Sequence, residues 1–144
     1  MRFWNAFVAI ALVPVVAADF YFGQVVCYAW NLSVVETYAT MLPANNNKCL
    51  TAVKPDSEYY QQQRHHVYGS TMTAQICGAS ITVTLHNSHT PPSWTSSDGG
   101  SGRCISLDPS LKGNQPLCGK YFPKLGLLPC AYTMNGVCDS YLCK

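Results

Sequence analysis

Eight cysteines constrain the fold of this 144-residue chain more than any other feature of its sequence. They are Cys27, Cys49, Cys77, Cys104, Cys118, Cys130, Cys138 and Cys143. An even number of cysteines in a small chain from an oxidising compartment is typical of a disulfide framework, so we expect four disulfides. The spacing leaves the pairing open. Because four of the cysteines lie within residues 118–143, we expect the C-terminal segment to be held by cross-links.

A zinc site is the alternative use of these cysteines. Structural zinc sites commonly contain two ligands separated by two to four residues, with a matching pair elsewhere in the chain. The tightest pair here is Cys138 and Cys143, and no second pair matches it. We therefore expect no metal and no cofactor.

The first eighteen residues predict the oxidising compartment. Arg2 supplies a positive charge, an uncharged apolar run covers Ala6–Val16, and small residues follow at Ala17 and Ala18. This pattern is typical of a secretory signal peptide. The run is shorter than the roughly 20 apolar residues that span a bilayer. We predict a signal peptide over 1–18 and a single secreted domain over 19–144, without a membrane anchor.

The charge composition limits the class of partner. Charged residues make up 11% of the chain, and its formal net charge is +2. Nucleic-acid-binding domains usually carry a clustered basic patch, so we expect no nucleic-acid partner. A neutral, polar surface is common in extracellular proteins.

One segment has the signature of a helix. Ser33 and Glu36 stand in the S-x-x-E relation of a capping box. Apolar residues then recur at helical spacing up to Leu42, and Pro43 ends the pattern. The sequence therefore predicts a short helix over Ser33–Leu42.

Several other segments favour extended structure. Runs of β-branched and aromatic residues predict strands at Phe22–Trp30, Lys48–Val53, Ser70–Asn87 (with a turn or bulge at Gly78), Arg103–Leu107 and Cys130–Asn135. Small polar residues predict a loop over Thr90–Gly102, and Ser57–Gly69 is ambiguous. The expected fold class is α+β: a small antiparallel sheet with one or two short helices, stapled by about four disulfides.

Two residues are candidates for surface roles. Trp94 lies in the expected loop, where an exposed indole would be a contact site. Asn31 begins an N-x-[ST] glycosylation motif, Asn31-Leu32-Ser33. A glycan beside a helix start and near Cys27 would be sterically unfavourable, so the motif leaves glycosylation open.

The histidines raise the alternative of a secreted ribonuclease, which needs an acid, a base and a cation for the phosphate. Candidates for these groups are His65, His66, His86, His89, Glu36, Glu58 and Arg64. The histidines have no diagnostic spacing and could equally be polar surface residues. The chain has no G-x-S-x-G motif for nucleophilic hydrolysis, and we expect no enzymatic activity.

The combination resembles a known class of protein. A signal-like start, "MRFWNAFVAIALVPVVAA", precedes a cysteine framework from Cys27 to Cys143, with few charges and no catalytic motif. This layout is similar to the small secreted cysteine-rich effectors of plant-pathogenic fungi, and resembles the avirulence proteins of Leptosphaeria and related Dothideomycetes.

That resemblance implies secretion into the host apoplast, with uptake into host cells as a further option, and we expect the chain to be a monomer. There it would bind host plant proteins to suppress defence, and a host resistance protein could detect it. A killer-type antimicrobial toxin is a third alternative, although its near-neutral charge is unusual for a membrane-active protein.

Overall fold

The computed structural model describes residues 20–54, 61–63, 71–86, 90–107 and 117–143. The predicted signal peptide and most of the ambiguous segment 57–69 lie outside these residues.

The described chain is nearly all sheet, with 61% strand and 7% helix. Its strands are β1 (Phe20–Tyr28), β2 (Val34–Pro43), β3 (Gln61–Gln63), β4 (Thr71–Ile76), β5 (Ala79–Thr84), β6 (Ser93–Ser96), β7 (Ser101–Ser106), β8 (Cys118–Phe122) and β9 (Gly126–Cys138). A 3-10 turn, η1 (Ala44–Asn46), and one helical turn, α1 (Cys49–Ala52), follow β2.

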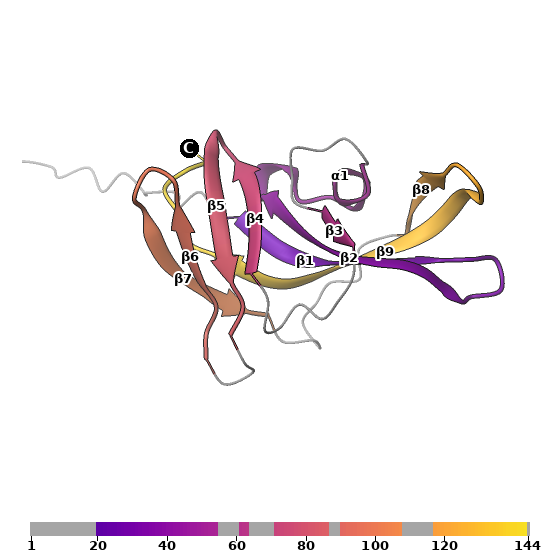
Figure 1. Ribbon diagram of the computed structural model, residues 1–144, viewed down its shortest axis with the longest axis horizontal. Helices are drawn as coiled ribbons and strands as arrows, with labels where there is room; N and C mark the ends of the chain where they lie inside the picture. Colours follow the sequence, from indigo (N-terminus) through magenta and orange to yellow (C-terminus); the bar gives the residue numbers. More distant parts are fainter. Residues whose placement is uncertain (1–19, 55–60, 64–70, 87–89, 108–116, 144) are drawn as a thin grey trace, which may run out of the picture.

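The strands form one antiparallel sheet in the order β3-β2-β1-β9-β7-β6-β5-β4, and β8 pairs with β9 outside this path. The sheet curls until it is nearly closed, like a barrel (Figure 1). β9 is the central strand, because it pairs with β1 along most of its length. On its other edge, β9 pairs with β8 near its start and with β7 near its end.

Side-chain alternation builds the larger of two cores. Along β4 and β5, alternate residues are buried, as expected for a sheet with one face covered. These inward residues pack with residues of β1, β2 and β6 in a cluster that includes Phe20, Phe22, Met41, Met72, Ile76, Ile81, Val83, Leu85 and Trp94.

A second core lies at the other end of β1 and β9, next to α1. It contains Val25, Tyr38, Leu42, Ala52, Val53 and Tyr132 with the buried cysteines Cys27, Cys49 and Cys130. This smaller core supports the hairpins described below.

The predicted α+β class is wrong, chiefly because the predicted helix Ser33–Leu42 is the strand β2. β2 pairs with β1 along its length, and its residues from Tyr38 to Pro43 are all buried. Burial on both faces of a strand gives an apolar run that can match helical spacing by chance. The capping box does not form, since the Ser33 hydroxyl donates to Asn31 Oδ1 (2.6 Å).

Two further predictions of local structure are corrected. Lys48–Val53 was expected as a strand and contains the helical turn α1. Thr90–Gly102 was expected as a loop and contains β6 and the start of β7. Small side chains there are needed for packing: a Cβ added to Gly102 would lie 2.5 Å from the Trp94 indole nitrogen.

Other predicted strands are confirmed. Ser70–Asn87 contains β4 and β5, joined by a turn at which Gly78 has a left-handed φ of 84°. Phe22–Trp30 largely matches β1, while Arg103–Leu107 and Cys130–Asn135 fall mostly within β7 and β9.

Four disulfides form, as predicted. The pairs are Cys27–Cys130, Cys49–Cys118, Cys77–Cys143 and Cys104–Cys138. Each of the last four cysteines thus joins one of the first four. The C-terminal segment is cross-linked to β1, α1, the β4–β5 turn and β7, which is the stapling that the sequence indicated.

Candidate functional site

Two hairpins extend from the same end of the sheet. β1 and β9 pair as far as Cys27 and Cys130, which are also joined by a disulfide. Beyond this point the β1–β2 hairpin and the β8–β9 hairpin separate and project from the body of the molecule (Figure 1). Most of the large exposed apolar side chains of the described residues lie on these two hairpins.

The outer face of the β8–β9 hairpin is an apolar patch. Tyr121 and Leu127 are directly opposite each other and are 68% and 62% exposed. Leu127 lies over Gly119, where an added Cβ would approach its methyl carbon to 2.8 Å. Leu125, in the connecting turn, is also exposed, and the exposed Lys124 adjoins it. We call Tyr121, Lys124, Leu125 and Leu127 the outer patch.

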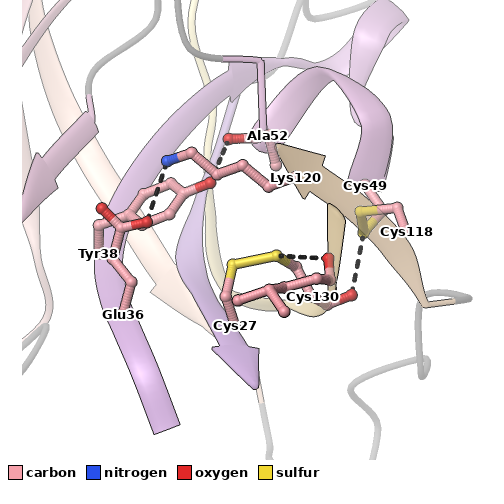
Figure 2. The surroundings of a disulfide bond; sticks show 9 residues. Cys27, Glu36, Tyr38, Cys49, Ala52, Cys118, Lys120 and Cys130 are labelled. Carbon is pink, nitrogen blue, oxygen red and sulfur yellow. Dashed lines mark hydrogen bonds and ion pairs between the residues drawn. A yellow bond between two sulfur atoms is a disulfide. The ribbon is translucent and has the colours of Figure 1, made fainter. Parts of the chain in front are cut away.

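The inner face of the same hairpin carries an ion pair that is largely shielded from solvent (Figure 2). Lys120 Nζ lies 3.2 Å from a carboxylate oxygen of Glu36 on β2, and the two side chains are only 12% and 11% exposed. The same ammonium lies 4.2 Å from the ring centroid of Tyr38 and 5.5 Å from that of Phe122. A cation over aromatic faces is attracted by their quadrupoles, so charge and rings together hold β8 against β2.

Tyr38 completes this cluster without being reactive. Its hydroxyl donates a hydrogen bond to the Ala52 carbonyl at 3.2 Å (Figure 2). Burial raises the pKa of Tyr38 well above its usual value, and the nearby Glu36 charge raises the pKa further. The phenol therefore stays protonated at neutral pH. The cluster of Lys120, Glu36, Tyr38 and Phe122 links β8 to β2, and we call it the clasp. Its geometry offers no activated nucleophile.

Two disulfides fix the hairpin to the second core. Cys118 at the start of β8 is bonded to Cys49 of α1, and Cys130 in β9 is bonded to Cys27 of β1. Figure 2 shows both bonds close to the Lys120–Glu36 pair. The outer patch is therefore presented by a hairpin whose other face is attached at several points.

The tip of the β1–β2 hairpin has a different character, because all six residues from Trp30 to Val35 are exposed. Trp30 is 82% exposed and Leu32 is 81% exposed. The turn is closed by hydrogen bonds from Leu32 N to the Ala29 carbonyl and from Ala29 N to the Ser33 carbonyl, both 2.8 Å. Leu32 has a φ of 63°, in the left-handed region.

Trp94 is not available as a contact residue. It lies in β6, is 2% exposed and pairs with Val83. Its ring packs edge-on against Phe20 at 6.0 Å, and its indole nitrogen donates to the Asp139 carbonyl at 3.0 Å. The small polar residues around Trp94 suggested a loop. Their small size instead leaves room for the buried indole.

Asn31 lies at the exposed tip of the β1–β2 hairpin, where its Oδ1 accepts hydrogen bonds from the Ser33 backbone and hydroxyl. The helix that argued against a glycan is absent. Glycosylation at Asn31 stays a prediction.

The ribonuclease residues are only partly described. His65, His66, His89, Glu58 and Arg64 lie outside the described residues. His86 is exposed, with its Nε2 3.4 Å from the Ser93 hydroxyl, and Glu36 belongs to the clasp. Among the described residues, no three His, Cys, Asp or Glu side chains are grouped so as to hold a metal ion. No described helix has the length and apolar character to cross a bilayer.

The outer patch and the clasp were not expected from the sequence. The sequence predicted no strand between Leu107 and Cys130, where prolines and glycines are frequent. A signal was present, since Tyr121 and Leu127 flank a Pro123-Lys124-Leu125-Gly126 turn of the kind that joins hairpin strands. The contact between Lys120 and Glu36 joins residues 84 positions apart and has no local signature.

Comparisons with known proteins give no relative: no family model, no curated protein and no solved structure matches this chain.

Proposed function

We propose that this chain is a secreted effector of a plant-pathogenic fungus that binds a host protein through the outer patch. Binding would suppress a defence response, and a host resistance protein would detect the effector in some plant lines. The observation that carries the proposal is the apolar outer patch on a hairpin that two disulfides attach to the second core.

The composition of the patch supports a protein partner. Tyrosine is enriched at the centres of protein interfaces and often contributes much of the binding energy. The patch is one-sided, because Lys120 and Phe122 of the same hairpin face the second core, where the Lys120 ammonium lies over Tyr38. A pre-organised surface also loses little conformational entropy on binding.

The patch also indicates the chemistry of the partner. Its one charge is the Lys124 ammonium, and residues 117–138 include no acidic residue. The fitting partner surface has an apolar depression for Tyr121 and Leu127 with a carboxylate at its rim, since complementary charge favours the correct orientation.

Four disulfides are consistent with an extracellular protein. The predicted signal peptide and the resemblance to fungal effectors support secretion into the apoplast, and uptake into host cells is part of the same hypothesis.

The test is expression of the secreted chain in leaves of genetically different host lines, beside a Tyr121→Ser/Leu127→Ser variant. We expect cell death or defence suppression in some lines, and its loss in the variant. The matched control is Leu50→Ser/Ile105→Ser, which removes two apolar residues, each 69% exposed, from other surfaces. An equal response to the variant and its parent would contradict the proposal. Death in every line would instead favour a general toxic activity.

A further inference from the structure

The tip of the β1–β2 hairpin is exposed on every side, unlike the one-sided outer patch. The residues from Trp30 to Val35 are exposed without interruption, and four of these six are large apolar residues: Trp30, Leu32, Val34 and Val35. The hairpin extends past the other described elements (Figure 1). A partner that covers only one face would leave much of this apolar surface in water.

The charges around the tip are arranged for a neutral or anionic surface. The sequence has no charged residue between Asp19 and Glu36. The Glu36 carboxylate faces the Lys120 ammonium at 3.2 Å, which neutralises the nearest acid along the chain. The exposed charge on the neighbouring hairpin turn is Lys124, a cation.

Leu32 indicates that the tip has a role other than stability. A left-handed φ is unfavourable for a residue with a branched side chain and is usually occupied by glycine or asparagine. The Leu32 side chain is 81% exposed, so its packing offsets little of this cost. Backbone strain of this kind is concentrated at functional sites.

We infer that this tip inserts into the interfacial region of a phospholipid bilayer. Lipid surrounds an inserted tip on all sides, which fits apolar residues without a covered face. Trp30 suits the headgroup boundary, where tryptophan is enriched, and Leu32 suits the adjoining acyl region. The two backbone hydrogen bonds of the turn pair four of its polar groups, which lowers the cost of moving the tip out of water.

The cation on the neighbouring turn strengthens this contact. An exposed lysine near the membrane surface is attracted to anionic headgroups. Lys124 therefore favours vesicles that contain an anionic lipid over neutral ones. This membrane contact goes beyond the proposed function, because the inserted residues lie on a different hairpin from the outer patch and the partner belongs to a different class.

Tryptophan fluorescence tests the inference directly. The chain after residue 18 has two tryptophans, the exposed Trp30 and the buried Trp94, so a change in emission or quenching reports on Trp30. The disulfide-bonded protein, produced without a glycan on Asn31, is mixed with vesicles of phosphatidylcholine or of phosphatidylcholine and phosphatidylserine. We expect a blue shift, protection of Trp30 from aqueous iodide, and quenching by brominated lipids.

Variants distinguish insertion of the tip from non-specific hydrophobic adsorption of the protein to vesicles. Leu32→Ser should weaken vesicle partitioning at least tenfold while Trp30 remains as the reporter. Ile105→Ser, which removes an exposed apolar residue from β7, should partition like the parent. Leu32→Gly should raise the stability to urea, because it relieves the left-handed strain, and should still weaken partitioning. Lys124→Gln should reduce the preference for phosphatidylserine vesicles.

Three results would overturn the inference: Trp30 remains accessible to iodide with both kinds of vesicle, Leu32→Ser partitions like its parent, or Trp30 is shielded only when leaf membrane proteins are present. In the last case, the partner of the tip is a protein. The first two readouts use purified lipids, so they are independent of the leaf response that tests the outer patch.

Discussion

Two buried tyrosines, Tyr38 and Tyr132, should make the folded state less stable at alkaline pH. Burial raises the pKa of both phenols above the usual value, with smaller contributions from Glu36 and Tyr21 respectively. Their hydroxyls donate to the Ala52 carbonyl at 3.2 Å and to Asn47 Oδ1 at 2.9 Å. The folded state therefore keeps both protons at a pH where the unfolded chain releases them.

The sign of the effect follows from this difference. Tyrosine in an unfolded chain has a pKa of about 10, so the stabilising contribution is fully present below that pH and is lost as the pH rises toward the raised folded values. We expect the free energy of unfolding to fall above pH ~10 by up to about 1.4 kcal/mol per pH unit for each tyrosine. Urea unfolding between pH 8 and 11 measures this. Tyr38→Phe and Tyr132→Phe should each flatten the slope, and a pH-independent stability would contradict the assignment.

At the scale of elements, β8 is held against β2 by one charged contact. Lys120 reaches Glu36 from a strand that does not pair with β2, because β8 pairs with β9. The contact is made possible by the curl of the sheet, which brings the inner face of the β8–β9 hairpin over Tyr38. Its low exposure separates it from an ordinary surface ion pair.

We predict that Lys120→Met destabilises the protein by about 1–3 kcal/mol, between the values typical of exposed and buried pairs. The variant removes the cation that faces Glu36 and the cation–π contact with Tyr38. Unfolding in guanidinium chloride measures the loss. The double variant Lys120→Met/Glu36→Gln should recover part of it, since the two residues are coupled. Strictly additive losses would show that the pair does not act as a clasp.

The predicted helix that forms a strand shows that local patterns alone do not decide between the two. The Ser33–Leu42 segment has helical spacing, yet Val34, Val35, Thr37, Tyr38 and Thr40 are residue types that favour strands. In the structure, β1 and the second core cover this segment, so partners far along the chain select the strand. By contrast, β4 and β5 were predictable, because strict alternation and a glycine turn are local signals.

At the scale of the whole molecule, the disulfides differ in their access to solvent. Cys77 is exposed at the β4–β5 turn, where its φ is 50°, and its partner Cys143 is partly exposed. The other three bonds each include at least one fully or almost fully buried cysteine. Thiol–disulfide exchange requires that a thiolate reach a sulfur, so accessible bonds are reduced first.

We therefore predict that limiting dithiothreitol reduces Cys77–Cys143 before the other bonds. Alkylation followed by peptide mass spectrometry should label Cys77 and Cys143 first. The partly reduced protein should stay folded, because Cys104–Cys138 and the Trp94–Asp139 hydrogen bond still hold the chain next to Cys143. A Cys77→Ser/Cys143→Ser variant serves as the control for stability. Early labelling of Cys49 or Cys118 would contradict the prediction.

The sequence by itself determined that this is a small chain cross-linked by four disulfides, because cysteine number can be read without knowing the fold. It also determined the strands whose residues alternate. Only the tertiary structure decided the all-sheet fold, the disulfide pairing, the burial of Trp94 and the two apolar hairpin ends. These depend on contacts such as Lys120–Glu36 and Cys27–Cys130, which join residues that are distant in sequence. Local patterns do not specify such contacts, because the sheet must curl before the residues meet.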